Sequence, residues 1–180
     1  MLWYHQGRES EGFGMKKALF DTELAAVEAF GRAAMPLTER DGCERCAAIV
    51  RRKGGYRLGK MRRGFHNNVI FQAVIVAFCS LFWGQTVLAH THPRCCCHAG
   101  EVFSGERDAR GKITALGDVC VPSMGRIRRI WLVSPAGFLS CWDGKNRPLR
   151  VGKLTDRQGE PLCIRTPCAS RMGGWIAKKA

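Results

Sequence analysis

The chain has 180 residues, which is enough for one domain with its own hydrophobic core and too short for two of ordinary size. Hydrophobic residues make up 46% of it and charged residues 24%, and this composition excludes wholesale disorder. The net charge of +14 would suit nucleic acid or an acidic surface. The sequence has no helical basic stripe, RNA-binding aromatic signature or zinc-finger spacing, so we do not expect a nucleic-acid partner.

The ten cysteines are irregularly spaced, with a lone pair at Cys43 and Cys46 and a triplet at 95–97. A secreted disulfide framework normally follows a signal peptide, and residues 1–20 do not read as one. We therefore expect reduced thiols and a cytoplasmic location.

The first 20 residues show no periodicity and are expected to form a loose leader. Asp21 or Thr22 can cap a helix that continues to about Ala34, because apolar residues recur there at helical spacing. Pro36 is expected to end this helix.

A strand, a glycine turn and a second strand are predicted next, from Cys43–Val50 and from the residues that follow Gly54 and Gly55. Glu44 lies at the mouth of the first of these strands. A lone glutamate in such a place is most often a solvated surface residue, so its interest depends on what lies near it.

Residues 69–89 carry no charged side chain and are the most apolar part of the chain. One interpretation is a signal or membrane anchor, preceded by Met61-Arg62-Arg63, which would make the protein secreted or membrane-anchored. We favour a buried helix or strand that is broken at Gly84 and followed by a strand over 86–90, because polar residues interrupt the apolar run.

That strand would deliver His90 and His92, spaced so that both imidazoles project from one face. Two such imidazoles can share a metal ion, and a carboxylate farther along the chain could complete three protein ligands. Three ligands leave a fourth position for water, which is the layout of a catalytic zinc site. Ser104 is then expected to cap a helix that carries Asp108 near the same face.

Two apolar runs between 129 and 142 surround a Pro-x-Gly turn and predict a structural hairpin. The remaining residues, 146–180, are basic and interrupted by glycine and proline. We expect them to form a weakly ordered extension.

In their order along the chain, Glu44, His90-Thr-His92-Pro93, Ser104 and Asp108 resemble the JAB/JAMM (MPN, Mov34) metalloprotease motif. The segments DTELAAVEAF, CERCAAIV, FSGERD and WLVSPAGFLSCWDG extend the resemblance to JAB-like domains of bacterial polymorphic toxin and secretion-associated proteins. It implies a single α/β domain over residues 21–145, with a curved mixed sheet flanked by helices.

The resemblance also implies the role of each residue. His90, His92 and Asp108 would be zinc ligands, Glu44 the general base, and Ser104 would hold the water or stabilise the oxyanion. The implied reaction is hydrolysis of a peptide or isopeptide bond, with a toxin or effector protein as the context. The basic composition favours an acidic protein or peptide substrate.

One spacing departs from the family motif, because three residues separate Ser104 from Asp108 where the family has two. Either a turn absorbs the extra residue or the domain binds without cleaving. A second hypothesis is a closed, non-catalytic zinc site formed by His90 and His92 with Cys95–Cys97 and His98. A third is a small basic protein that uses residues 69–89 as a signal or anchor.

Overall fold

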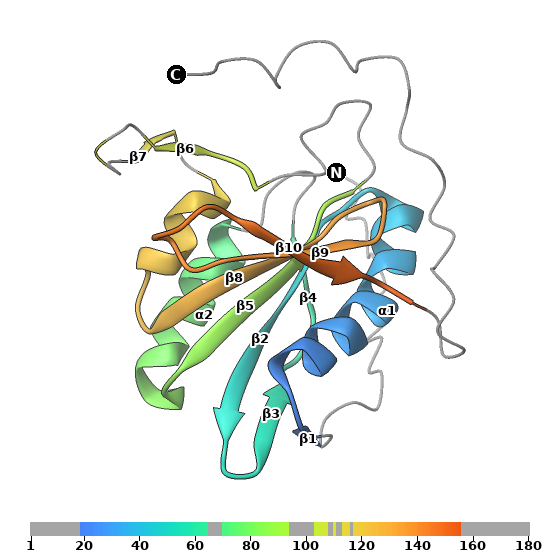
Figure 1. Ribbon diagram of the computed structural model, residues 1–180, viewed down its shortest axis with the longest axis horizontal. Coiled ribbons are helices and arrows are strands. Elements are labelled where there is room, and N and C mark those ends of the chain that lie inside the picture. The colour runs from blue at the N-terminus through green and yellow to red at the C-terminus, as the bar shows by residue number, and fades with distance from the viewer. Residues whose placement is uncertain are drawn as a thin grey trace, which may run out of the picture.

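The structure, a computed structural model, describes residues 19–64, 70–93, 103–107, 110, 113–115 and 117–155. These residues form a curved mixed sheet with a helix on each face (Figure 1), which confirms the predicted α/β class. The elements, in chain order, are β1 (Leu19–Phe20), α1 (Glu23–Asp41), β2 (Arg45–Arg52), β3 (Gly55–Leu58), β4 (Arg62–Arg63), α2 (Ile70–Trp83), β5 (Thr86–Thr91), β6 (Glu106–Arg107), β7 (Ile113–Ala115), the 3₁₀ helix η2 (Asp118–Ser123), β8 (Ile127–Val133), β9 (Phe138–Trp142) and β10 (Leu149–Lys153).

The strand order in the main sheet of the described residues is β1-β3-β2-β5-β8-β9-β10, and β4 pairs with the first residues of β2. The neighbours β5 and β8 run parallel, whereas the other neighbouring strands of this sheet run antiparallel. A parallel pair needs a crossover connection, and here that connection includes the β6-β7 hairpin and η2. The first residue of η2, Asp118, lies near the carboxyl-terminal end of β5, where it contacts His90.

Each helix covers its own hydrophobic core. Side chains of α1 such as Phe30 pack against Ile49 and Trp131 on one face of the sheet. Side chains of α2 pack on the other face, against Leu88 and Ile130. Burying a side chain as large as Phe30 contributes about 1.5–3 kcal/mol, so these two layers hold the central strands in place.

The helix α1 begins as predicted, because the Thr22 side chain accepts a hydrogen bond from the Ala25 amide. The predicted end at Pro36 is wrong, since α1 continues to Asp41. The turn after Pro36 is held by Thr38, whose buried hydroxyl lies 2.7 Å from that of Thr91 in β5. Gly42, with a φ of 67°, then caps the helix by donating its amide to the Thr38 carbonyl.

Both predicted hairpins are confirmed. β2 and β3 meet at a glycine turn, with Arg52 paired to Gly55. β8 and β9 are joined by the turn at Ser134–Gly137, where the Gly137 amide donates to the Ser134 carbonyl at 2.8 Å and Gly137 has a φ of 79°. A left-handed φ of this kind explains why glycine stands at the end of that turn.

The apolar stretch forms a helix, a break and a strand, as in the interpretation we favoured, but the helix is buried on one face only. α2 ends at Trp83, Gly84 has a φ of 84°, and β5 starts at Thr86. Among the described residues, no helix combines the length and the hydropathy needed to cross a bilayer.

Two other expectations were wrong. The region after Ser104 contains the strands β6 and β7, paired as a hairpin, where we expected a helix. The extension after residue 145 contributes β10, which pairs with β9, and the fully buried Leu154, which belongs to the core under α1. Apolar residues at Leu149, Val151 and Leu154 supply the strand pattern that the many basic residues obscure.

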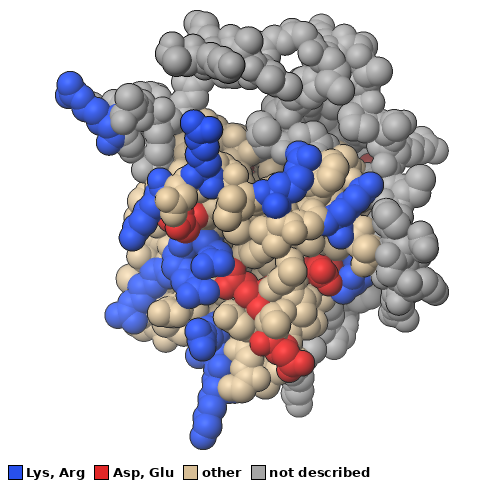
Figure 2. Space-filling model, in the orientation of Figure 1, with Lys and Arg blue, Asp and Glu red and all other residues tan. Residues whose placement is uncertain are grey.

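The described surface is basic. Lysine and arginine side chains project across the face shown in Figure 2, and acidic side chains lie between them. Two basic side chains of β10 also contact an aromatic ring: Arg150 lies 3.8 Å and Lys153 5.7 Å from the ring centre of Phe138.

Candidate metal centre

The end of β5 presents two histidines to the same side of the sheet. His90 lies within the strand, opposite Cys46 of β2, and His92 follows the strand directly. Alternation along a strand places both on the face that α2 covers. Both are buried, with exposed fractions of 0% for His90 and 4% for His92.

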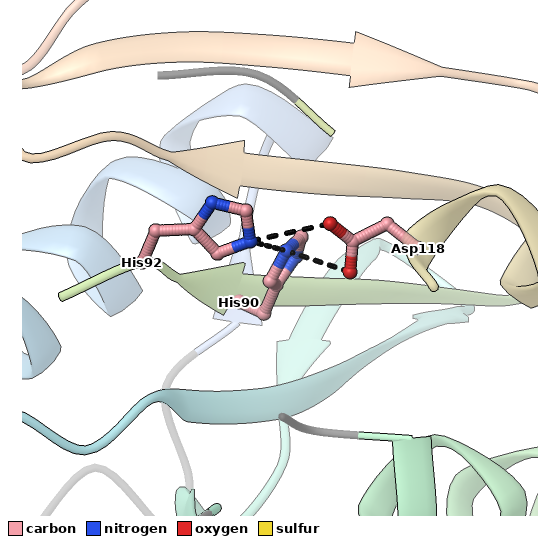
Figure 3. Close-up of side chains that lie close together, drawn as sticks. All are labelled: His90, His92 and Asp118. Atoms are coloured by element: carbon pink, nitrogen blue, oxygen red, sulfur yellow. Dashed lines mark hydrogen bonds and ion pairs between the residues drawn. The ribbon is translucent and has the colours of Figure 1, made fainter. Parts of the chain in front are cut away.

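Asp118, the first residue of η2, joins the two histidines (Figure 3). One carboxylate oxygen lies 3.1 Å from Nε2 of His90, and the other lies 3.2 Å from Nε2 of His92. The two Nε2 atoms are themselves 3.1 Å apart. One ligand atom from each residue thus lies within 4.8 Å of the others, and the group could hold a metal ion.

The hydrogen bonds of His90 determine which of its nitrogens is free. Nδ1 lies 2.8 Å from the backbone carbonyl oxygen of Trp131 and must therefore carry a proton, because a carbonyl oxygen only accepts. In the neutral imidazole, Nε2 is then an unprotonated acceptor that faces the Asp118 carboxylate. Acceptors that converge in this way repel each other unless a proton or a metal cation lies between them.

Glu44 lies immediately before β2 and approaches the same group. The register of β2 and β5 pairs Cys46 with His90, and its continuation places Glu44 opposite His92. The Glu44 carboxylate oxygen is 3.9 Å from Nε2 of His92. Burial raises the pKa of Glu44 to about 7; His92 opposes the shift and the Asp118 charge adds to it.

Asp118 is held as a carboxylate. Burial alone would raise its pKa, but the neighbouring His90 and His92 outweigh burial and lower the pKa well below its ordinary value. Cys46, by contrast, has a pKa raised by burial to about 12, so its thiol stays neutral beside His90. Of these two side chains, Asp118 is therefore the one that is ionised at neutral pH.

Ser104 forms hydrogen bonds with Asp118. Its amide and its hydroxyl lie 2.8 and 3.0 Å from the same Asp118 carboxylate oxygen, and its hydroxyl oxygen accepts from the Asp118 amide at 3.1 Å. Ser104 is exposed, whereas the carboxylate it contacts is buried. The serine therefore fixes the direction of the third candidate ligand from the surface side.

Two glycines allow this contact. A Cβ atom on Gly117 would lie 2.6 Å from the Gly105 nitrogen and 2.6 Å from the Ser104 carbonyl carbon. Gly105 has a φ of 90°, and a Cβ there would lie 2.6 Å from the Val119 side chain. The backbone at Gly117 thus packs closely against that of Ser104 and Gly105 at the base of the β6-β7 hairpin. This close packing brings Ser104 and Asp118 together.

The structure brings together Glu44, His90 and His92, as the sequence suggested, and it places Ser104 beside Asp118. The predicted third ligand, Asp108, lies outside the described residues, as do Cys95–Cys97 and His98 of the alternative site. Sequence reasoning missed Asp118. No local spacing signals this residue, because Asp118 reaches the histidines through the connection between β5 and β8.

No protein-family model, curated protein or solved structure matches the chain. The kind of metal that the site could bind is therefore inferred from its ligand atoms alone. Two imidazole nitrogens and one carboxylate oxygen form a set that suits a divalent transition metal, zinc included.

Proposed function

We propose that the chain is a zinc-dependent hydrolase of the JAB/JAMM type that cleaves peptide or isopeptide bonds. His90, His92 and Asp118 would hold the zinc ion, which, when bound, supplies Lewis acidity for activating water and polarising a carbonyl group. The observation that carries the proposal is the convergence of these three donors with a fourth group, Glu44, beside them.

Glu44 is suited to act as the general base. Its carboxylate is 3.9 Å from Nε2 of His92, so it borders the three donors without being one of their tight partners. A pKa near 7 allows a carboxylate to take a proton from the attacking water and to return it to the leaving amine. An ordinary glutamate, with a pKa near 4.5, would be a weaker base at neutral pH.

Ser104 receives a different role from the one that the family resemblance implied. Its hydroxyl donates to the Asp118 carboxylate and accepts from the Asp118 amide, so both of its functions serve Asp118. We propose that Ser104 is a positioning residue for the metal ligand. The hydrogen bond from His90 to the Trp131 carbonyl serves the same purpose for the imidazole.

An acidic protein or peptide is the substrate that the charges favour. Arg63 and Arg62 of β4 border the start of β2, next to Glu44, and both are exposed. The net charge of +14 would also attract acidic chains over longer distances. Toxin or effector processing in bacteria is the context that the resemblance suggests.

The test compares the wild type with Glu44→Gln, which keeps the shape of the side chain and removes the base. Each protein, loaded with zinc, is incubated with an acidic denatured protein and with a quenched peptide that contains a lysine isopeptide bond. Mass spectrometry detects new termini. The wild type should cleave one of them, and the variant should be slower by about 10²–10⁴-fold at equal zinc content.

Equal zinc content without cleavage by either protein would overturn the hydrolase and would leave a metal-binding module. Equal cleavage by both would overturn the role of Glu44. Loss of zinc in Glu44→Gln would mean that Glu44 is a ligand.

A further inference from the structure

The helix α2 has a second apolar face that the fold leaves open. Its inner face packs on the sheet, through residues such as Ala73 and Val76. Its outer face exposes four large apolar side chains, at 50%, 65%, 48% and 77% respectively: Val74, Phe78, Leu81 and Phe82. These residues, spaced by four, three and one along the helix, form a continuous stripe, called here the outer stripe of α2.

The outer stripe exceeds what a water-exposed helix normally carries. Phe78 and Phe82 lie edge to face, with ring centres 5.9 Å apart, so they form one aromatic surface. Isolated exposed apolar residues are common, but a contiguous group on one helix marks a surface that contacts another apolar phase. Mean hydropathy along α2 is high, and its sequence contains no charged residue.

Basic groups lie at both ends of the helix. At the carboxyl-terminal end, the Arg52 guanidinium is 3.5 Å from the Trp83 carbonyl oxygen. The amide of Arg126 donates to the Ser80 hydroxyl at 2.8 Å, and Arg52 and Arg126 are both exposed. At the other end, the Arg63 carbonyl accepts a hydrogen bond from Gln72; the Arg63 side chain is 61% exposed, and its Nε lies 3.0 Å from the Asp41 carboxylate.

We propose that the outer stripe of α2 docks the domain on an anionic lipid surface. α2 has 14 residues and is about 21 Å long, so it can lie along a membrane with its phenylalanines at the level of the acyl chains. Arg52 and Arg126 at its carboxyl-terminal end would then reach the headgroup phosphates. This inference stands independently of the proposed hydrolase activity.

Charge favours a lipid surface over a second copy of the chain. Two stripes packed against each other would bring together the arginines at the ends of both helices, and α2 offers no aspartate or glutamate to pair with them. The net charge of +14 on each copy adds to this repulsion. An anionic membrane supplies both the apolar phase and the opposite charge.

The test is cosedimentation of the full chain with phosphatidylcholine vesicles, with and without phosphatidylserine. The variant Phe78→Ser/Phe82→Ser removes the aromatic surface, and Leu149→Ser/Val151→Ser is the matched control, because it removes two exposed apolar residues of β10. The wild type and the control should bind the phosphatidylserine vesicles. The α2 variant should bind them at least about tenfold more weakly, with the same thermal unfolding midpoint and zinc content as the wild type.

A second variant, Arg52→Glu/Arg126→Glu, should also bind more weakly, and added salt should weaken the wild type in the same way. Equal vesicle binding by the wild type and the α2 variant would overturn the proposal. Light scattering that shows a dimer, lost in the α2 variant and unaccompanied by vesicle binding, would overturn it in favour of self-association.

Discussion

Ser104 and Asp118 lie 14 positions apart in the chain and hold each other through three hydrogen bonds. The segment between them includes the paired strands β6 and β7 (Figure 1). The motif that the sequence resembles pointed to Asp108, four positions after Ser104, whereas the aspartate that Ser104 contacts is Asp118.

Ser104→Ala should weaken zinc binding about 10–100-fold, because Asp118 loses a hydroxyl partner that directs its carboxylate. Competition with a chromophoric chelator measures the affinity. Ser104→Thr keeps the hydroxyl and should stay close to the wild type. If the alanine variant kept full affinity and lost only activity, Ser104 would act on the substrate and not on Asp118.

Gly117→Ala should destabilise the fold by about 1–3 kcal/mol, because the new methyl group would meet the backbone of Ser104 and Gly105 at 2.6 Å. Urea unfolding followed by tryptophan fluorescence gives the free energy. Gly152→Ala is the control, since a Cβ atom there has no neighbour within 4 Å. Equal stability of both variants would mean that the backbone around Gly117 can move apart without loss of folding free energy.

Stability should fall with acid through Asp41. Burial would raise the pKa of this carboxylate, but hydrogen bonds from Arg45 at 2.7 and 3.1 Å and from the Cys43 amide lower the pKa from 3.8 to about 2. A pKa lowered by folding stabilises the folded state above about pH 4, and this contribution is lost as the pH falls toward 2. Asp41→Asn should therefore be less stable at pH 6 and should lose less stability between pH 4 and pH 2. Parallel curves for the two proteins in chemical unfolding would contradict the assignment.

The fold could be predicted where the signal was local. Thr22 as a helix cap, the glycine turn after β2 and the Pro-x-Gly turn after β8 each depend on neighbouring residues, and each is confirmed. The end of α1 could not be predicted in this way. The buried contact between Thr38 and Thr91 joins residues 53 positions apart, and it helps to hold the helix beyond Pro36.

In the candidate site, too, local sequence signals predicted some residues, and a residue that depends on long-range contacts was missed. His90 and His92 are neighbours on one strand, so their common face follows from strand alternation alone. Glu44 comes beside them through the pairing of β2 with β5, and the sequence pointed to it only through the order of residues in the family resemblance. Asp118 depends on a hairpin and on the crossover from β5 to β8, and the fixed spacing of the resembled motif pointed to Asp108 instead.

The most direct test of the metal centre measures bound zinc by atomic absorption in Asp118→Asn and Asp108→Asn, with His90→Ala/His92→Ala as the reference for loss. The wild type and Asp108→Asn should hold about one zinc ion per chain, whereas Asp118→Asn should lose most of its zinc at the same free zinc concentration. Circular dichroism confirms that each variant is folded. Retention of zinc by Asp118→Asn together with its loss in Asp108→Asn would contradict the assignment of Asp118 as the third ligand, and with it the proposed centre.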